Sequence, residues 1–339
     1  MDIKKIAKLA GVSTMTVSNV LNNKGRMSVA TRKRVLDIIK MSEYYPNEAA
    51  RILSIGKKDV IAFVSSKLAS PFISEVLSSI EDRAIETNKY VFGIEHYSTR
   101  RFENNSERIL NELLYSKKVS GVILLSILPQ EKIVEKYKQR GVPLVLLESK
   151  IKGAHCVHVN NKKGSYDAVQ YLIKKGRKRI CIITARQLIS EKEEMLPTTL
   201  ERMEGYMSAL RDNGITFEPS FVEEVNDYTF EDGVKALERF ISKKINFDSI
   251  FCASGDITAM GVLYRAKELG IKIPDDVSLI GYDDFFAGKI LTPALTTVKQ
   301  PIKEMGQAAF DLALEGIQEK LKEDKIIELN PQLIIRESA

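Results

Sequence analysis

Residues 3–21 read IKKIAKLAGVSTMTVSNVL, and their spacing predicts two short helices joined by a tight turn. Apolar residues recur at helical spacing as far as Ala10, with lysines on the opposite side. Gly11 then interrupts this period, at a position that suits a turn with positive φ. Ser13 is a good N-cap for a second helix that runs to about Asn22. The stretch therefore predicts a helix-turn-helix unit near the start of the chain.

The first 58 residues also carry an excess of positive charge. They hold 12 lysines and arginines against 4 acidic residues, a net charge of +8, whereas the whole chain of 339 residues has a net charge of +6. Residues 59–339 hold the remaining 39 basic and 41 acidic residues and sum to −2. Clustered lysines and arginines suit duplex DNA, because each one that neutralises a phosphate releases condensed counterions. A solvated basic tail has the same charge, so the uncharged residues must decide between the two.

The second helix presents side chains that suit the reading of DNA. In a helix-turn-helix, the first residues of the second helix meet base edges in the major groove. Thr14 and Asn19 offer hydrogen bonds, and Met15 offers an apolar surface to a thymine methyl group. The alternative is an ordinary surface helix rich in small polar residues. The candidate DNA-binding residues of the head are Thr14, Met15, Thr16, Ser18, Asn19, Asn22 and Thr31.

A third helix is predicted from Ser28 to about Tyr44, and it would complete a small three-helix head with a thin core. Pro46 ends this helix, because a proline disfavours a helical conformation in the residue before it. Asn47 can then cap a short helix, NEAARILS, that ends before Gly56. The predicted core stripe of the third helix consists of Val29, Val35, Ile38, Ile39 and Met41.

Two segments of this head resemble the LacI/GalR family of bacterial transcription regulators. They are AKLAGVSTMTVSNVLNN, residues 7–23, and YYPNEAARIL, residues 44–53, and the resemblance continues along essentially the whole chain. It implies that the second segment forms a hinge helix that enters the minor groove in a dimer. Leu53 would be the wedge in a base step, with Asn47 and Ala50 as neighbouring groove contacts. An apolar wedge of this kind unstacks the step and bends the duplex.

One position departs from the family pattern. Asn19 stands where the family often has a basic residue able to read guanine, and asparagine more naturally reads adenine. The usual operator of the family is therefore not expected for this chain.

After residue 58, strand-like apolar runs alternate with amphipathic helical stretches. This alternation predicts parallel sheets with helices on both faces, and the length fits two such sets with a break near Asn160. The fold class is thus a small all-α helix-turn-helix head plus an α/β body of two doubly wound, parallel-sheet lobes. The predicted strands are residues 60–65, 90–96, 121–126, 143–148, 179–184, 249–254 and 278–283. The predicted helices are residues 71–88, 106–116, 130–140, 164–175, 200–213, 230–242 and 258–269.

The family resemblance also implies how the chain divides. The two lobes would be similar to type I periplasmic binding proteins, with chain crossings near residues 160, 290 and 323. Residues 296–301 and 302–319 would then return to the first lobe. The expected parts are a DNA-binding head, residues 1–46; a hinge helix and linker, 47–58; a first lobe, 59–159 plus 290–322; and a second lobe, 160–289 plus 323–339.

The two lobes are expected to share one ligand-binding cleft. Doubly wound folds bind ligands at the carboxyl ends of their strands, and in a two-lobed body these ends face each other. Carboxylates and an arginine that converge there suit the hydroxyl groups of a polyhydroxylated ligand. From strand ends and family motifs, the candidate effector residues are Phe72, Ile73, Glu148, Arg202, Tyr228, Gly255, Asp283 and Gln300.

Each of these residues also has an ordinary explanation as a core aromatic, a surface or capping acid, or a solvated arginine. Two positions differ from the family as well. Gly255 stands where the family often has asparagine, and Asn160 stands where it often has aspartate. The hydrogen-bond pattern of the cleft is therefore expected to be particular to this chain.

Composition and motifs weigh against other classes of protein. The chain is 44% apolar and 28% charged, no apolar run is long enough to span a bilayer, and lysines interrupt any signal sequence, so a cytoplasmic protein is expected. The three cysteines lack disulfide or metal-site spacing, and His155, Cys156 and His158 are predicted to begin a strand rather than to bind a metal. GxGxxG, GxxxxGK[ST] and GxSxG do not occur, so neither an enzyme nor a cofactor is expected.

These features and the resemblance together imply a repressor that binds double-stranded, near-palindromic operator DNA as a homodimer. No leucine heptad follows the final strand-like pair, so the tetramer seen in some relatives is not expected. A small-molecule effector in the cleft, a sugar or sugar derivative, would control DNA affinity and link the protein to carbohydrate metabolism. Two alternatives stay open: control by a protein co-regulator, and a sugar-binding protein without DNA function.

Leu53→Ala is predicted to weaken specific operator binding far more than non-specific DNA binding, because the wedge acts only at the base step that it unstacks. Mobility-shift titrations at one salt concentration, with an operator duplex and a scrambled duplex, measure the two affinities. Equal weakening of both would exclude the wedge role.

Overall fold

The structure, a computed structural model, describes residues 2–21, 25–42, 60–66, 70–87, 93–99, 106–116, 118–185, 197–226, 228–319 and 323–339. The chain divides into two compact units, a head within residues 1–58 and a body within residues 59–339. No helix in these described ranges is long and apolar enough to cross a membrane.

Three short helices form the head: α1 (Ile3–Ala10), α2 (Thr14–Leu21) and α3 (Val29–Met41). Gly11 ends α1 in the left-handed conformation, with φ of 61°. The Ser13 hydroxyl accepts a hydrogen bond from the Thr16 amide at 3.1 Å and so satisfies a free N–H in the first turn of α2. The predicted helix-turn-helix is confirmed. Its core consists of Ile6, Ala7, Ala10, Val17, Val20 and Val35.

The predicted core stripe of α3 is only partly correct. Val35 is fully buried and Ile38 and Ile39 pack partly against the core, but Val29 and Met41 are 85% and 86% exposed. Both exposed residues lie six positions from Val35, which places them about 120° around the helix at 3.6 residues per turn. The small head therefore contacts α3 along one narrow stripe.

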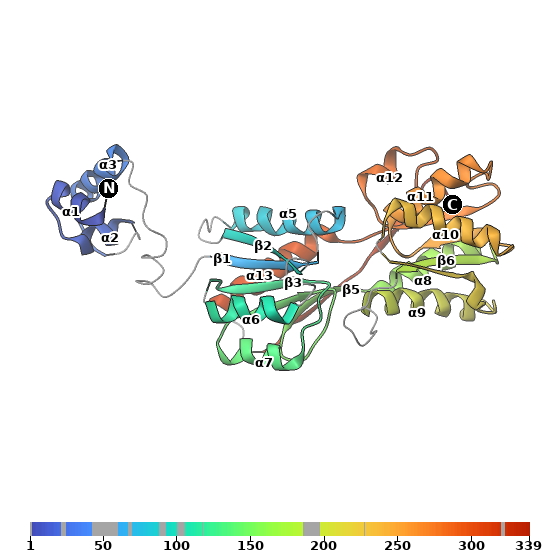
Figure 1. Cartoon of the computed structure of the whole chain (residues 1–339), viewed down its shortest axis with the longest axis horizontal. Coiled ribbons are helices and arrows are strands. Elements are labelled where there is room, and N and C mark those ends of the chain that lie inside the picture. The colour runs from blue at the N-terminus through green and yellow to red at the C-terminus, as the bar shows by residue number, and fades with distance from the viewer. Residues whose placement is uncertain are drawn as a thin grey trace. The chain divides into compact units, whose positions relative to one another are not determined.

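Six parallel strands form the sheet of the first lobe, in the order β11-β5-β4-β3-β1-β2. The strands are β1 (Val60–Ser65), β2 (Gly93–Ser98), β3 (Gly121–Leu125), β4 (Leu144–Leu147), β5 (His155–Val159) and β11 (Ile326–Leu329). One face packs against α5 (Pro71–Glu86) and α13 (Ile302–Ile317). The other face packs against α6 (Ser106–Ser116) and α7 (Glu131–Gln139), as Figure 1 shows.

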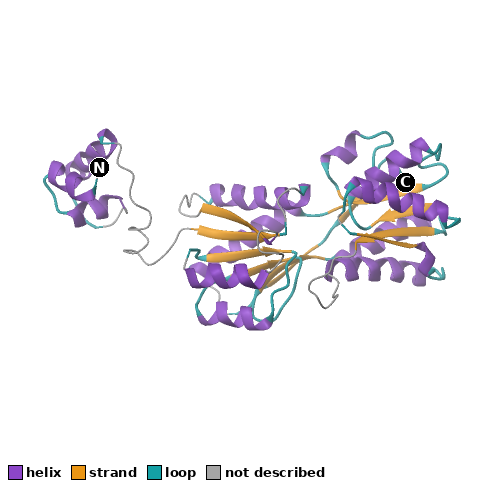
Figure 2. Ribbon diagram, in the orientation of Figure 1, coloured by secondary structure: helices purple, strands orange, loops and turns teal. Residues whose placement is uncertain are grey.

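The second lobe repeats this arrangement, with strand order β12-β10-β9-β8-β6-β7. Its strands are β6 (Ile180–Ala185), β7 (Val222–Val225), β8 (Ser249–Cys252), β9 (Ser278–Asp283), β10 (Thr296–Lys299) and β12 (Gln332–Ile334), of which only β12 is antiparallel to its neighbour among the described pairings. Helices α8 (Asn161–Lys174) and α9 (Pro197–Asp212) cover one face. Helices α10 (Phe230–Ser242) and α11 (Asp256–Glu268) cover the other, and the short α12 (Phe286–Ile290) follows β9 (Figure 2).

The order of these sheets corrects two of the expected chain crossings. Residues 296–299 were expected in the first lobe, but they form β10, which pairs with β9 of the second lobe. Residues 326–329 were expected in the second lobe, but they form β11, which pairs with β5 of the first. The chain therefore crosses near residue 160, between β10 and α13, and between β11 and β12. Neither segment was among the seven predicted strands, and the local sequence carries no information about which of two sheet edges a strand joins.

Helices α10 and α11 approach each other through two reciprocal glycines. A Cβ atom at Gly261 on α11 would lie 2.0 Å from the Phe230 carbonyl oxygen, and one at Gly233 on α10 would lie 1.9 Å from the Thr258 carbonyl oxygen. Because the obstacles are backbone atoms, no side-chain rotation can relieve the clash. The two helices must therefore separate if either glycine is replaced.

Gly261→Ala is accordingly expected to lower the free energy of unfolding by about 1–3 kcal/mol, the usual effect of overpacking. A thermal or urea melt of the full chain measures the change. Gly288→Ala is the matched control, because its Cβ would meet no atom closer than 3.5 Å. Similar melting of the two variants would show that the α10–α11 contact tolerates the extra methyl group.

Candidate functional site

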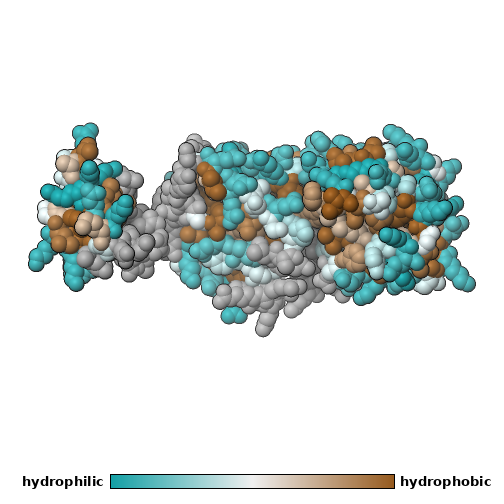
Figure 3. Space-filling view, turned by 90° about the horizontal axis from the view of Figure 1, so that it is seen from above, coloured by the Kyte–Doolittle hydropathy of each residue, from teal (hydrophilic) through white to brown (hydrophobic). Residues whose placement is uncertain are grey.

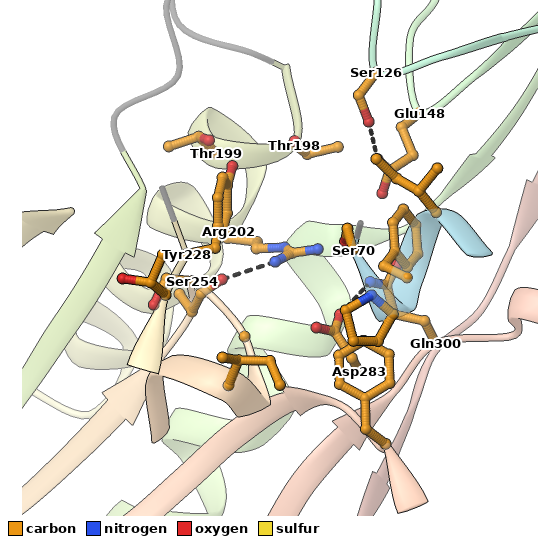
Figure 4. Close-up of a pocket in the computed structure, with 18 of the residues that line it drawn as sticks. Ser70, Ser126, Glu148, Thr198, Thr199, Arg202, Tyr228, Ser254, Asp283 and Gln300 are labelled. Atoms are coloured by element: carbon orange, nitrogen blue, oxygen red, sulfur yellow. Dashed lines mark hydrogen bonds between the residues drawn. The ribbon is translucent and has the colours of Figure 1, made fainter. Parts of the chain in front are cut away.

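A cavity of about 330 Å³ lies in the body, where the carboxyl ends of strands from both lobes meet. Its walls come from the carboxyl ends of β1, β3 and β4 of the first lobe and of β6, β7, β8, β9 and β10 of the second, together with the segments that follow these strands. Figure 4 shows polar side chains from both lobes pointing toward its centre. The structure brings all eight predicted effector residues to this one cavity, namely Phe72, Ile73, Glu148, Arg202, Tyr228, Gly255, Asp283 and Gln300.

Arg202 is held rigidly in the wall of the second lobe. It is 8% exposed, and its Nε and Nη1 atoms donate to Asn161 Oδ1 at 2.9 Å and to the Ala253 carbonyl oxygen at 2.7 Å. Its guanidinium carbon lies 3.7 Å from the centroid of the Tyr282 ring, and the Tyr282 hydroxyl also donates to Asn161 Oδ1, at 3.0 Å. Stacking and two hydrogen bonds fix the plane of the guanidinium, and Figure 4 shows its free end directed into the cavity.

Glu148 brings a carboxyl group from the opposite lobe. It is 7% exposed, and its Oε2 atom accepts a hydrogen bond from the Ser126 hydroxyl at 2.6 Å. Burial raises the pKa of Glu148, while the positive charge of Arg202 and the hydrogen bond from Ser126 partly oppose this rise. An acid of one lobe and an arginine of the other thus influence each other across the cavity.

Asp283 is the second acid of the cavity, at the end of β9. Its Oδ1 atom accepts a hydrogen bond from Gln300 Nε2 at 2.6 Å. Burial raises the pKa of Asp283, Arg202 opposes the rise, and the nearby carboxylate of Asp256 adds to it. Gly255 faces the same carboxyl group, because a Cβ atom at Gly255 would lie 2.9 Å from Asp283 Oδ2. The carboxyl group of Asp283 therefore occupies the space that a side chain at position 255 would need.

Backbone strain concentrates at this cavity. Seven described residues other than glycine have positive φ, and four of them line the cavity. Such conformations cost about 1–3 kcal/mol each and persist where the surrounding structure holds them, which is commonly at functional sites. The four residues are Ser126, Glu148, Tyr228 and Asp283.

Asn160, the other position that departs from the family, does not line the cavity. Its Oδ1 atom accepts from the Lys163 amide at 3.0 Å and caps α8, while its Nδ2 atom donates to Glu328 Oε1 at 3.1 Å. It therefore anchors the chain where the two lobes join.

The candidate DNA-binding residues of the head differ in how far they are exposed. Thr14 is exposed and Met15 is 68% exposed, whereas Ser18 and Asn19 are half-buried. Asn19 lies against Gly25, where a Cβ atom would stand 3.2 Å from its Nδ2 atom. The hydroxyls of Thr16 and Thr31 are hydrogen-bonded to those of Ser13 and Ser28, at 2.9 and 2.8 Å, near the starts of α2 and α3. The predictions for Asn22, Pro46, Asn47, Ala50 and Leu53 lie outside the described residues.

Two stretches of the chain match known protein families. Residues 2–47 match bacterial regulatory proteins of the lacI family, and residues 169–339 match the periplasmic binding protein-like domain. Over 341 residues, the chain is 32% identical to the HTH-type transcriptional repressor PurR of Escherichia coli O139:H28 (strain E24377A / ETEC), with 99% of this chain and 96% of that protein covered. The chain belongs to the lacI family. It is a DNA-binding transcriptional repressor of that family, and the expected fold class is confirmed.

Solved structures agree with this assignment. The transcriptional regulator CelR–cellobiose complex has a TM-score of 0.72 and 28% identity, with 100% of both chains covered. The lac repressor dimer bound to operator and the anti-inducer ONPF has a TM-score of 0.84, with 100% of this chain and 98% of that chain covered. At 22% identity the second likeness shows the fold alone.

The cavity of this lacI-family repressor also contains residues that sequence reasoning missed. Most carry hydroxyl groups, and many of them sit where a strand ends or where a helix begins. That position was the available signal, but serine and threonine occur at so many helix starts that it does not single them out. The missed residues with hydroxyl groups are Ser66, Ser70, Ser126, Thr184, Thr198, Thr199, Thr229 and Ser254.

The raised pKa of Asp283 predicts a pH effect on stability. The folded protein binds a proton at this carboxyl more tightly than the unfolded chain does, so this group's contribution to the free energy of unfolding falls as pH rises above about 4. Asp283→Asn removes the ionisation. The free energy of unfolding of this variant relative to that of the natural protein should therefore increase from pH 5 to pH 8, by no more than about 1.4 kcal/mol per pH unit, and its relative melting temperature should rise with it.

Melting curves of the full chain across this pH range test the prediction. Asp82→Asn, which removes an exposed acid on α5, is the control for general charge effects. A difference between Asp283→Asn and the natural protein that is flat or that shrinks with rising pH would contradict the expected sign.

Proposed function

We propose that this lacI-family repressor binds a near-palindromic operator as a homodimer and that a small molecule in the cavity of the body controls its DNA affinity. The observation that carries the proposal is the convergence of Glu148 from the first lobe with Arg202 and Asp283 from the second on one cavity. A small number of charged groups that are held in fixed positions around a cavity is typical of a ligand site. Their raised pKa values support the same interpretation.

A ligand in this cavity would act by touching both lobes at once. Contact with Glu148 and Phe72 on one side and with Arg202 on the other depends on the distance and angle between the lobes. A ligand changes an equilibrium only if it binds one arrangement more tightly than the other, and each tenfold preference corresponds to about 1.4 kcal/mol. The cavity walls supply that preference.

The effector that we propose is a sugar or sugar derivative. Support comes from the hydroxyl-bearing lining and from the similar CelR regulator, whose structure is a complex with cellobiose. In the head, Thr14 and Met15 are the exposed residues at the start of α2, so we assign them the contacts with base edges. The remaining candidates in the head, and the hinge residues Asn47, Ala50 and Leu53, belong to the same proposal.

The proposed homodimer gives two heads to a two-fold symmetric site. The body offers apolar surface for such a contact on the face of α11 and α12, where Tyr264, Phe286 and Ile290 are 50%, 71% and 68% exposed. Figure 3, seen from above relative to Figure 1, shows apolar patches among the hydrophilic surface of the second lobe. The lac repressor, which has the same fold, is a dimer in its operator complex.

The proposal is tested with an operator selected from a pool of random duplexes and a sugar panel screened by thermal shift, since a ligand of the native state raises its melting temperature. Arg202→Lys should keep operator affinity without ligand but weaken the response to the effector at least tenfold, because lysine keeps the charge and loses the fixed planar fork. Fluorescence anisotropy of labelled operator measures both quantities.

Arg211→Lys, an exposed position on the same helix, is the matched control. If Arg202→Lys and Arg211→Lys respond to the effector alike, the cavity is not the control site. If no duplex is enriched from the pool, the DNA-binding half of the proposal fails.

A further inference from the structure

We propose that Asn161 is a positioning residue with two separable tasks: it holds Arg202 in the wall of the cavity, and it holds the chain where it crosses between the lobes. Asn161 is the first residue of α8, immediately after the crossing near residue 160. It does not line the cavity, so it acts on the site through the arginine. The inference rests on the proposed function, because it explains how the arginine of that site is oriented.

The side-chain amide of Asn161 is buried, and both of its ends have partners. The residue is 1% exposed. Its Oδ1 atom accepts hydrogen bonds from Arg202 Nε at 2.9 Å and from the Tyr282 hydroxyl at 3.0 Å. Its Nδ2 atom donates to the carbonyl oxygen of Val159 at 3.1 Å. Because a guanidinium can only donate and a carbonyl oxygen can only accept, these partners fix which way round the amide lies.

The two ends of this amide serve different lobes. Arg202 on α9 and Tyr282 on β9 belong to the second lobe. Val159 is the last residue of β5 in the first lobe, where it pairs with Leu329 of β11. A single side chain therefore connects the arginine of one lobe to the sheet of the other.

Close packing keeps the first turn of α8 in place against the second lobe. A Cβ atom at Gly164 would lie 2.8 Å from the Tyr282 hydroxyl oxygen. A Cβ atom at Gly205 on α9 would lie 2.2 Å from the carbonyl oxygen of Lys162. The elements that supply the two donors to Asn161 are thus in direct contact with the turn that carries it, and its Oδ1 atom stays within their reach.

The two tasks use different atoms, so substitutions can separate them. Aspartate keeps an oxygen that accepts from Arg202 and Tyr282, but it has no N–H group to donate to Val159. Asn161→Asp should therefore keep the hold on the arginine and lose the hold on the crossing. Asn161→Ala removes both, and a buried donor or acceptor left without its partner is costly.

A neighbouring acid makes a control for charge necessary. Burial raises the pKa of Glu201 on α9, while the charge of Lys150 and hydrogen bonds from the side chain and backbone of Asn161 oppose the rise. A carboxylate at position 161 would repel this acid. Asn213→Asp makes the same chemical change just after α9, at an asparagine whose Nδ2 atom also donates two hydrogen bonds, and it serves as the matched control.

The first measurement follows the Arg202 side chain in the full chain without any ligand. Its Nε–H proton gives a signal in nitrogen-15 NMR spectra of the deuterated protein, and Arg202→Lys assigns the signal by removing it. At pH 7, Asn161→Ala should speed exchange of this proton with water by about tenfold or more, because its acceptor is gone. Asn161→Asp and Asn213→Asp should leave the exchange rate within about threefold of that in the natural protein.

The second measurement follows the crossing. Hydrogen exchange of backbone amides, measured by mass spectrometry over residues 156–164, reports how readily this segment opens. Asn161→Ala and Asn161→Asp should each raise its exchange rate about fivefold or more, whereas Asn213→Asp should not. Peptides from α10 are the internal reference, since general destabilisation of the fold would raise their exchange as well.

Three results would overturn the proposal. An unchanged Arg202 signal in Asn161→Ala would show that other groups hold the arginine. Unchanged exchange at the crossing in Asn161→Asp would show that the Nδ2 atom does not hold it. Faster exchange in α10 to the same extent as at the crossing would show a merely structural role.

If Asn161→Ala does not fold, Asn161→Asp still decides the question. Faster exchange at the crossing with a protected Arg202 proton supports the two tasks, and any other combination contradicts them. Neither measurement uses a ligand. Failure to find an effector would therefore count against the proposed function and leave these results as the test of Asn161.

Discussion

The buried carboxylate of Asp256 holds together the wall on which the cavity depends. The residue is 0% exposed, and its carboxyl oxygens accept hydrogen bonds from the Thr297 hydroxyl at 2.6 Å and the Phe285 amide at 2.9 Å. Three segments are thereby joined: the start of α11, strand β10 and the turn after β9. That turn carries Asp283 and Asp284, both with positive φ, at 116° and 66°. These hydrogen bonds hold the turn in its strained backbone conformation.

The same interaction explains why some neighbouring positions lack side chains. A Cβ atom at Gly281 would lie 2.2 Å from Asp256 Oδ1, and one at Gly255 would approach Asp283. The arrangement then continues outward, because Asp284 forms an ion pair with Arg336 just beyond β12. One buried acid thus links the cavity wall to β10, after which the chain passes from the second lobe to the first.

Sequence reasoning reached seven of the described strands and the cavity because both leave a strong local signal. Apolar runs mark buried strands, and the ends of those strands are where a doubly wound fold places its ligand. It missed β7, whose sequence is VEEV. Glu223 in that strand is 5% exposed and accepts hydrogen bonds from Arg239 and Lys243 at 2.5 Å, a tertiary contact that no pattern of apolar residues announces.

Two other errors have the same origin. The crossings near residues 290 and 323 were misplaced because β10 and β11 each join the sheet edge that long-range pairing selects. The side chains of Val29 and Met41 were assigned to a core that is too small to reach them. In each case the local sequence does not reveal which other part of the fold the segment packs against. Sequence reasoning did not single out Asp256 at all, since an acid in the first turn of a helix is usually a solvated one.

The unequal walls of the cavity bear on how a ligand would produce a signal. The second lobe supplies Arg202, Asp283 and most of the hydroxyl groups, so a ligand held by that lobe keeps those contacts in every arrangement of the body. Contacts present in both arrangements add affinity and shift no equilibrium. Discrimination between arrangements must come from the smaller wall of the first lobe, chiefly Glu148 and the start of α5 at Phe72. Affinity and response therefore reside in different residues of one cavity, and a change in the first-lobe wall would alter the response more than the binding.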